Sequence, residues 1–167
     1  RKITVVIDEC FLEFTRKKGF FETHSMQEYP NVIIVKAFTK LYAIPGVRLG
    51  FLFCGSQNKT GQIFNQLPEW NISIIAEAAG RAALDETEYR NKTISYIGKE
   101  RAYLKAELEK LGIKVYPGEA DFLLIKTEHQ LYNDLLKKKI LIRDCSNYRG
   151  LRTGYYRIAV KTHQENE

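Results

Sequence analysis

Two cations flank a turn in the segment KAFTKLYAIPGVRLG, which spans residues 36–50. Lys40 follows an apolar run, and Arg48 comes eight residues later, beyond the Pro45-Gly46 pair. A lysine amine that is partly desolvated beside another cation has a lowered pKa, and only the neutral amine forms a Schiff base. The planar guanidinium of an arginine suits a phosphate. Lys40 is therefore a candidate for covalent chemistry and Arg48 for anion binding; the alternative for Lys40 is a solvated surface lysine.

A carboxylate follows the first apolar run of the chain. Asp8 stands at the end of KITVVI (residues 2–7), which has the β-branched composition of a buried parallel strand. Open α/β sheets bind ligands at the carboxyl ends of their strands, so a carboxylate at that position can pair with a cationic ring nitrogen. The alternative is an acid that caps the next element.

Two arginines lie within apolar runs near the end of the chain. Arg143 stands in ILIRDC and Arg157 in YYRIAV. A charge in such surroundings needs a carboxylate or phosphate partner, because an unpaired buried charge is costly. We interpret the two arginines as an anion-recognition surface, and salt bridges to Asp144 or a nearby glutamate are the alternative.

Composition limits the class of protein. The chain has 167 residues and a formal net charge of +6, with 44% hydrophobic and 28% charged residues, as in ordinary soluble globular proteins. No run is long enough to span a membrane, and the cations are scattered apart from residues 16–18 and 137–139, so we expect no membrane and no nucleic-acid partner. The three cysteines are widely spaced, which predicts reduced thiols, a cytoplasmic protein and no metal site: Cys10, Cys54 and Cys145.

The apolar patterns predict an α/β fold in two parts. Strands are expected at residues 2–7, 31–38 and 48–55, with turn residues after the third. A helix is expected over residues 73–84, and a long amphipathic helix from Glu86 to about Leu111, stopped by Gly112. The remaining residues suggest a β-β-α-β-β unit. The chain begins directly on a strand, so we also expect it to be part of a longer protein.

These residues in this order carry a resemblance to a known family. The sequence VVIDEC…VKAFTKLYAIPGVRLG…YYRIAV is similar to the second half of pyridoxal-phosphate enzymes of the aspartate-aminotransferase fold (fold type I). The segment TKLYAIPGVRLG resembles the branch that contains histidinol-phosphate aminotransferase and threonine-phosphate decarboxylase. The likeness spans essentially the whole chain. It implies that residues 1–90 are part of a large cofactor-binding domain with a mostly parallel sheet, and that residues 91–167 form a long linking helix and an α+β small domain.

The resemblance implies roles around the cofactor, pyridoxal 5'-phosphate. Lys40 would bind the cofactor as a Schiff base and shuttle the proton at the substrate's Cα. Asp8 would pair with the pyridinium nitrogen, so that the ring acts as an electron sink. Arg48 would hold the cofactor phosphate, and Thr39 is a candidate hydroxyl contact.

The resemblance also implies roles toward the substrate. Arg157 would bind the α-carboxylate, and Arg143 would bind the substrate's own phosphate or a second anion. Two positions depart from the pattern, because many relatives have a hydroxyl residue where this chain has Ala37 and a tyrosine where it has Phe11. Cofactor binding therefore depends on other groups at these two positions.

Two reactions fit the resemblance. The first is decarboxylation of a phosphorylated amino acid, as by threonine-phosphate decarboxylase of cobalamin biosynthesis. The alternative is transamination of histidinol phosphate with 2-oxoglutarate, as in histidine biosynthesis. A non-catalytic relative, in which Lys40 merely packs or pairs, is a third possibility. The family's glycine-rich phosphate loop, ring-stacking aromatic residue and ring-oxygen asparagine precede the aspartate strand, and its sites lie at a dimer interface. We therefore expect this chain alone to be inactive and the whole protein to be a homodimer.

Overall fold

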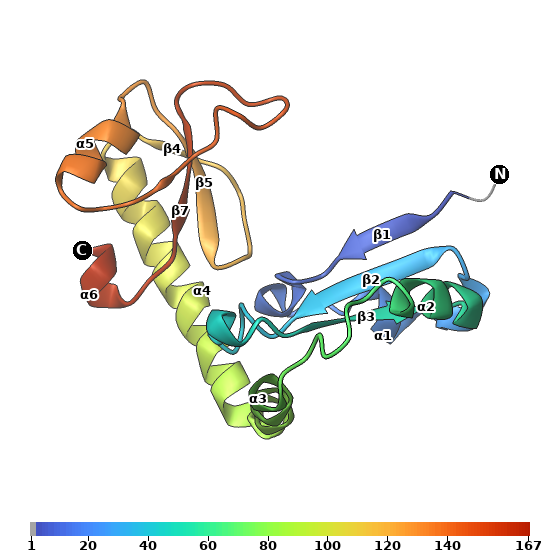
Figure 1. The fold of residues 1–167 in the computed structure, drawn as a ribbon. Coiled ribbons are helices and arrows are strands. Elements are labelled where there is room, and N and C mark those ends of the chain that lie inside the picture. Colours follow the sequence, from blue (N-terminus) through green and yellow to red (C-terminus); the bar gives the residue numbers. More distant parts are fainter. Residues whose placement is uncertain (1–2) are drawn as a thin grey trace. The chain divides into compact units, whose positions relative to one another are not determined.

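The computed structural model describes residues 3–167, which form two compact units, one up to Ile94 and one from Ser95 to Glu167 (Figure 1). The first unit contains, in order, β1 (Val5–Asp8), η1 (Leu12–Thr15), α1 (Phe20–Thr23), η2 (Met26–Glu28), β2 (Val32–Ala37), η3 (Pro45–Val47), β3 (Gly50–Cys54), α2 (Gln57–Phe64) and α3 (Ile74–Asp85). Helix α4 (Thr87–Lys110) runs from the first unit into the second. The second unit continues with β4 (Lys114–Val115), β5 (Phe122–Lys126), α5 (Leu131–Lys137), β6 (Arg143–Asp144), β7 (Tyr155–Ala159) and α6 (His163–Asn166).

The described sheet of the first unit has the order β1-β2-β3. β1 runs parallel to β2, with Asp8 opposite Val35, whereas β2 and β3 are antiparallel. The prediction of a mostly parallel sheet therefore holds for only one of these two pairings. The segment between β2 and β3 contains no crossover helix, and a parallel return would need one. The predicted strand start at Lys2 lies outside the described residues.

A loop connects β2 to β3 and carries the predicted cation pair. Phe38 N–H donates to Leu49 O at 3.2 Å, which closes the loop at its base. Phe38 and Leu41 are buried, so the loop is anchored by its apolar side chains. Helix α3 packs on it at Gly80, where an added Cβ would meet the side chain of Leu49.

Helix α2 was not expected from the sequence, which predicted only turn residues after the third strand. Ser56 begins the helix, and its side-chain oxygen accepts from Lys59 N at 3.4 Å. Serine is a good N-cap because its side chain satisfies a free backbone donor of the first turn. The polar residues after the third strand, which were predicted to form a turn, therefore begin a helix.

The two longer predicted helices are present. Ser73 caps α3 by accepting from Ala76 N at 3.1 Å. Helix α4 ends before Gly112, whose φ of +75° reverses the chain, and Ile113 N–H then donates to Leu108 O at 3.1 Å. Glycine adopts this left-handed conformation without steric cost, which explains the stop.

The second unit has an antiparallel sheet of order β4-β5-β7-β6 in the described residues. After α4, the elements follow the predicted β-β-α-β-β order (Figure 1). The core of this unit is made by alternate residues of the strands together with side chains of α4 and α5. Leu123 and Ile125 on β5 are almost fully buried, and Leu104 of α4 packs in the same cluster. Lys126, the next residue of β5, is exposed.

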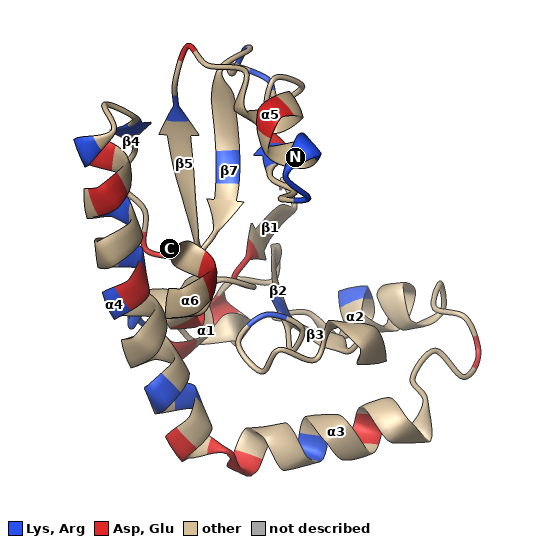
Figure 2. Ribbon diagram, turned by 90° about the vertical axis from the view of Figure 1, so that its left-hand side faces the viewer, with Lys and Arg blue, Asp and Glu red and all other residues tan. Residues whose placement is uncertain are grey.

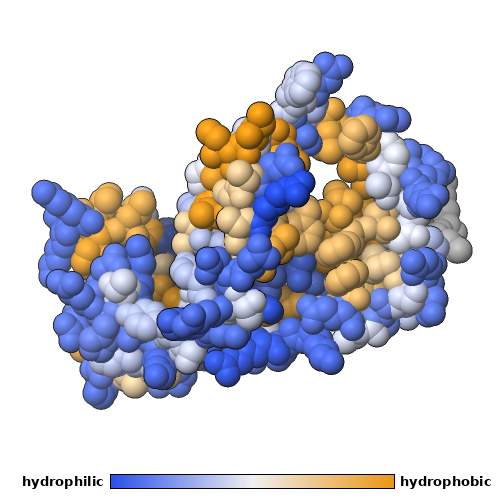
Figure 3. Space-filling model, turned by 90° about the horizontal axis from the view of Figure 1, so that it is seen from below, coloured by the Kyte–Doolittle hydropathy of each residue, from blue (hydrophilic) through white to orange (hydrophobic). Residues whose placement is uncertain are grey.

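Charged and apolar side chains are both exposed at the surface. Positive and negative residues are interspersed along α4 (Figure 2), where Lys92 pairs with Glu88 and Lys105 with Glu109. Apolar surface gathers in patches on the face shown in Figure 3. The most exposed large apolar side chains of the first unit include Trp70, at 95%, and Ile74, at 85%. None of the described helices is long and apolar enough to cross a membrane.

Candidate active site

Asp8 lies at the carboxyl end of β1, where the sequence predicted it. Its Oδ1 accepts a hydrogen bond from Cys10 N at 2.9 Å. Hydrogen bonds from the Cys10 thiol and backbone, together with the charge of Lys40, hold the pKa of Asp8 below its ordinary value against the opposing effect of desolvation. Asp8 is therefore ionised at neutral pH. A carboxylate that is kept ionised is suited to pair with a protonated ring nitrogen.

Lys40 lies close to this carboxylate. Its charge acts on both Asp8 and Cys10, and its Nζ lies 5.3 Å from the centre of the Phe11 ring. The structure thus brings Lys40 to the end of β1, from a loop more than thirty residues further along the chain. The amine itself is exposed, so the expected partial desolvation by its apolar neighbours is not seen; those neighbours point into the core instead.

Arg48 lies near the end of the loop between β2 and β3, just before β3. It ends η3 in a left-handed conformation, with φ 55° and ψ 39°, and its guanidinium donates to Pro45 O at 3.3 Å. Lys40 is two residues beyond the Phe38–Leu49 closure and Arg48 is one residue before it, so the two cations stand on opposite arms of one loop. The Arg48 side chain is exposed and keeps further donors available.

Three further residues lie next to the predicted cofactor-binding groups, and only one of them has a hydroxyl group. Thr39, next to Lys40, is half-buried in the same turn. Phe11 has no hydroxyl, and its ring faces the Lys40 ammonium instead. Ala37 ends β2 and pairs with Gly50 of β3, so it offers no hydroxyl either.

Arg143 and Arg157 lie directly opposite each other on β6 and β7. Arg143 donates to Asn147 Oδ1 at 3.0 Å and lies over the Tyr148 ring, while Arg157 lies over the Phe122 ring. Within the described residues of this unit, neither arginine forms an ion pair with a carboxylate, so the salt bridge to Asp144 that stood as the alternative interpretation is not seen there. Like charges opposite each other on antiparallel strands repel. Both side chains are exposed, contrary to the expected burial, and are free to bind an anion.

The predicted residues fall into two groups. The residues on β1 and on the loop between β2 and β3 belong to the first unit: Asp8, Thr39, Lys40 and Arg48. Arg143 and Arg157 belong to the second. The structure brings Lys40 near Asp8 in the first group and places Arg143 opposite Arg157 in the second. No cluster of three potential metal ligands occurs among residues 3–167.

Two neighbouring residues were missed by the sequence analysis. Cys10 donates to Asp8, and burial raises the pKa of its thiol to about 11, so it acts as a hydrogen-bond donor and not as a thiolate. Lys36 is buried between Glu9 and Glu13, with its Nζ 3.7 Å and 3.6 Å from their carboxylates. A sequence signal existed for Lys36, because it continues the alternation of Val32 and Ile34, which places it on the buried face of β2.

Comparisons with known proteins show the family of the chain. A family model described as aminotransferase class I and II matches residues 1–167. The threonine-phosphate decarboxylase of Salmonella typhimurium is 34% identical over 170 residues, covering 99% of this chain and 46% of that protein. The chain thus spans about half the length of the curated relatives that it matches.

Solved structures have the same fold. The histidinol-phosphate aminotransferase of Clostridium acetobutylicum superposes with a TM-score of 0.90 at 34% identity, covering 98% of this chain and 51% of that one. The histidinol-phosphate aminotransferase of Sinorhizobium meliloti, in complex with pyridoxal-5'-phosphate, has a TM-score of 0.78 at 23% identity, covering 96% of this chain and 45% of that one. Because the family model covers every residue and the fold matches along nearly the whole chain, the chain belongs to the family of class I and II aminotransferases, whose members include decarboxylases.

Proposed function

We propose that the protein is a pyridoxal-phosphate-dependent enzyme that acts on a phosphorylated amino acid or amine. Membership of the class I and II aminotransferase family supports the cofactor and the enzyme class. The observation that carries the proposal is the placement of Lys40 beside the ionised Asp8 at a strand end, with Arg48 on the same loop. These groups match the cofactor's needs in chemistry: an amine, a carboxylate and a phosphate ligand.

The predicted cofactor-binding residues of the first unit each have a role in this proposal. When bound, the cofactor supplies an electron sink for the charge that develops at the substrate's Cα. Lys40 provides the amine for covalent attachment and moves the proton at Cα. Asp8 holds the ring nitrogen protonated, and the hydrogen bonds from Cys10 keep Asp8 charged for that purpose. Arg48 binds the cofactor phosphate, with Thr39 as a second contact.

The arginines of the second unit define the substrate class. Arg157 binds a carboxylate and Arg143 a phosphate or second anion, because each offers a planar set of donors without a carboxylate partner. We infer that residues 91–167 are the linking helix and small domain, and residues 1–90 part of the large domain. A substrate that carries two anionic groups would bridge Arg143 and Arg157 and relieve their repulsion.

Decarboxylation of a compound such as threonine phosphate is the leading reaction, and transamination of histidinol phosphate with 2-oxoglutarate is the alternative. The two opposed arginines suit a substrate with two anionic groups, which describes threonine phosphate and also the 2-oxoglutarate of the alternative, so the release of carbon dioxide has to decide between the two reactions. The bond that is held perpendicular to the cofactor ring is the one that breaks. Release of carbon dioxide from threonine phosphate by the complete protein is the expected result, and glutamate-dependent amine transfer without carbon dioxide would overturn it.

The role of Lys40 has its own test. Replacing Lys40 with alanine in the complete protein should abolish covalent cofactor binding and reduce turnover by about a thousandfold or more, as expected for loss of a covalent and proton-transfer group. Lys59→Ala is the matched control, because Lys59 is a lysine of the same unit that donates to Thr4 Oγ1 at 3.0 Å. Unchanged turnover in Lys40→Ala would show that Lys40 takes no part in catalysis and merely packs or pairs.

Assembly is part of the proposal. Large apolar side chains of the first unit are exposed, and such surfaces are commonly covered by another part of a protein or by a second subunit. We propose a cytoplasmic homodimer for the complete protein and an inactive chain in isolation. If the isolated chain showed the absorbance of a lysine-bound pyridoxal cofactor, the proposal that it is inactive in isolation would be contradicted.

A further inference from the structure

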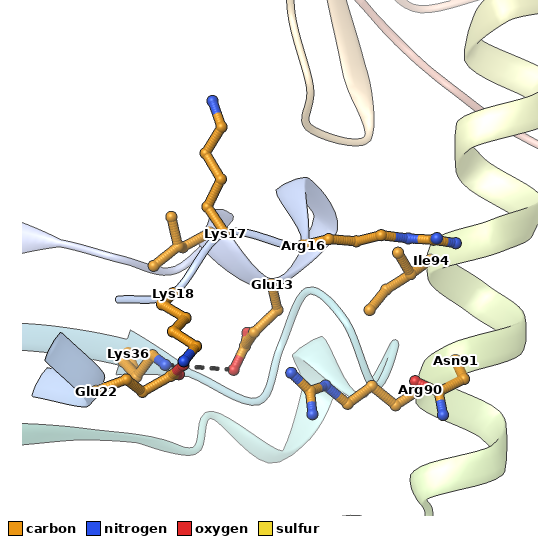
Figure 4. A pocket seen from close by; sticks show the side chains of 10 residues that line it. Glu13, Arg16, Lys17, Lys18, Glu22, Lys36, Arg90, Asn91 and Ile94 are labelled. Carbon is orange, nitrogen blue, oxygen red and sulfur yellow. Dashed lines mark ion pairs between the residues drawn. The ribbon is translucent and has the colours of Figure 1, made fainter. Parts of the chain in front are cut away.

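Two cavities, each formed by described residues of one unit, differ in their walls. The cavity of the first unit, of about 390 Å³, is lined mostly by charged side chains, and its Lys36 is already paired with Glu13 (Figure 4). The cavity of the second unit, of about 500 Å³, is lined mostly by leucine and isoleucine side chains. Small-molecule sites have this volume and are predominantly apolar, with a few polar groups. The cavity of the second unit is therefore suited to an apolar ligand.

The inner wall of this cavity belongs to the core of the second unit. Leu104 of α4, Ile125 of β5 and Ile142 line the cavity and are buried in the hydrophobic cluster of the unit. Ile158 of β7 packs against the same cluster and also lines the cavity. A ligand that covers such side chains removes apolar surface from water, which is the main favourable contribution to most binding.

The outer wall is formed by the segment that follows α5. Ile140 and Leu141 line the cavity and are exposed, although both are large apolar residues. Contiguous apolar side chains at the surface are a feature of ligand-binding grooves. The cavity thus has an apolar wall that is open to solvent as well as one that is buried.

Lys139, at the start of this segment, lines the cavity in an unfavourable backbone conformation. Its N–H donates to Leu136 O at 2.9 Å, and Ile140 N–H donates to Leu135 O at 2.9 Å, which is the Schellman arrangement at the end of α5. The arrangement requires the left-handed φ of +63° that Lys139 has, and glycine is the usual residue there. Such conformations in other residue types are found preferentially at functional sites.

The other charged groups of the lining already have partners. Lys161 Nζ lies 3.4 Å from Glu165 Oε1, and Glu165 Oε2 accepts from the Thr162 hydroxyl at 2.7 Å. The Lys139 ammonium forms no ion pair and no hydrogen bond with any described residue of this unit. The lining therefore carries one positive charge without a partner, which is complementary to a carboxylate.

We propose that this cavity binds a small carboxylic acid with an apolar body, which packs against Ile158 and Leu141 while Lys139 holds the carboxylate. The site is separate from the arginines of the proposed reaction. Ile158 lines the cavity, whereas Arg157, the residue before it on β7, points to the opposite face of the sheet. The ligand is thus additional to the proposed cofactor and substrate.

Octanoate and octylamine are the ligands that test the proposal, because they have the same chain length and opposite charges at neutral pH. Titration calorimetry on the chain should show saturable binding of octanoate that is about tenfold tighter than that of octylamine, as expected for one charge-assisted hydrogen bond. Equal affinity for the two ligands would show that the carboxylate is not recognised. Equal affinity, or the absence of saturable octanoate binding, would overturn the proposal.

Replacing Lys139 separates a binding role from a structural one. Lys139→Gly should weaken octanoate binding by about tenfold, while the midpoint of urea unfolding stays the same or rises, because glycine favours the left-handed conformation. Lys138→Gly, in the neighbouring lysine outside the lining, should leave the affinity unchanged. Equal weakening by both variants would indicate attraction to net charge only. A lower midpoint with unchanged affinity in Lys139→Gly would show that Lys139 serves only the end of α5, and either result would overturn the site.

A second pair of variants tests the apolar wall. Leu141→Gln should weaken octanoate binding several-fold, because it removes an apolar contact. Leu111→Gln is the matched control, since both leucines are 74% exposed and Leu111 is not part of the lining. If Ile74→Gln in the first unit abolishes binding while Leu141→Gln does not, octanoate occupies the exposed apolar surface of the first unit and the cavity proposal is wrong. Failure of the proposed enzyme activity would leave these binding results unaffected.

Discussion

The cations in the two sheets of the molecule differ in burial and in ion pairing. In the first unit, Lys36 points inward from β2 and is enclosed by the carboxylates of Glu9 and Glu13. In the second unit, Arg143 and Arg157 stand opposite each other on the exposed face of the sheet, and within that unit's described residues no carboxylate pairs with them. All three lie in strands and directly follow an apolar or aromatic residue, so their sequence contexts are similar.

Lys36 is therefore a cation that stabilises the fold, whereas Arg143 and Arg157 remain available for a ligand. A buried ammonium between two carboxylates is part of the core, and breaking such a cluster leaves an uncompensated charge. The opposed arginines repel each other, and the hydrogen bond of Arg143 to Asn147 and the ring contacts of both side chains do not neutralise their charge. In the proposed function, these two arginines bind an anion.

The largest expected effect is on the buried cluster. Lys36→Met should lower the free energy of unfolding by about 3–5 kcal/mol, because Glu9 is left as a buried charge without its cation. Urea unfolding measures this change. Lys92→Met, whose lysine is 75% exposed and pairs only with Glu88, should change it by less than about 1 kcal/mol. Equal effects of the two substitutions would remove the distinction between the buried and the exposed cation.

The second effect is on binding, and it should leave stability unchanged. Arg157→Met in the complete protein should weaken binding of a phosphorylated amino acid by about 10–100-fold, while the free energy of unfolding stays within about 0.5 kcal/mol of the original or rises. Substrate titration and urea unfolding of the same variant measure both quantities. Lys114→Met is the control, since it removes another exposed cation from this sheet, where Lys114 lies opposite Lys126. A large loss of stability in Arg157→Met would show that the arginine is structural.

The smallest effect concerns the second buried carboxylate, Glu100. Its Oε2 accepts from Asn166 Nδ2 at 2.9 Å and lies 3.1 Å from His163 Nδ1, which attaches α6 to α4. Hydrogen bonds from Asn166 and then His163 hold the pKa of Glu100 below its ordinary value, although desolvation opposes them. A lowered pKa in the folded state means that the stabilisation is present above the ordinary carboxyl pKa and is lost as the pH falls through the folded value.

We therefore expect α6 to detach under acidic conditions. The side-chain amide signals of Asn166 should shift as the pH falls below the ordinary carboxyl range, and Glu100→Gln should remove most of that dependence. Glu165 also has a lowered pKa, because it accepts from Thr162 in the capping box of α6, so Glu165→Gln is needed as the comparison. A pH-independent Asn166 signal down to about pH 3 would contradict this assignment.

Much of the fold could be predicted from local pattern. Ser73 and Gly112 mark the start of α3 and the end of α4 because capping and left-handed backbone depend on residue type alone. Strand direction was less accessible, since β3 returns antiparallel through a loop whose length did not reveal its path. Helix α2 was missed because Ser56 and the residues after it favour turns and helix starts equally.

The candidate site was predictable in its residue types but not in its contacts. Lys40 and Asp8 could be identified from their order and from the family resemblance, whereas the Cys10 hydrogen bond that keeps Asp8 ionised depends on a turn formed after β1. The amphipathic alternation of β2 placed Lys36 on the buried face, yet its two carboxylate partners come from β1's end and from η1.

The sequence by itself determined the family, the types of the chemical groups and the limits of the main helices, because caps, glycine stops and motif order are local properties. Only the tertiary structure decided which cations are neutralised and which are left exposed. Lys36 and Arg157 each follow apolar or aromatic neighbours in a strand, and the partners that distinguish them come from elsewhere in the chain. Charge pairing depends on distance in space, and the sequence order of residues does not contain that distance.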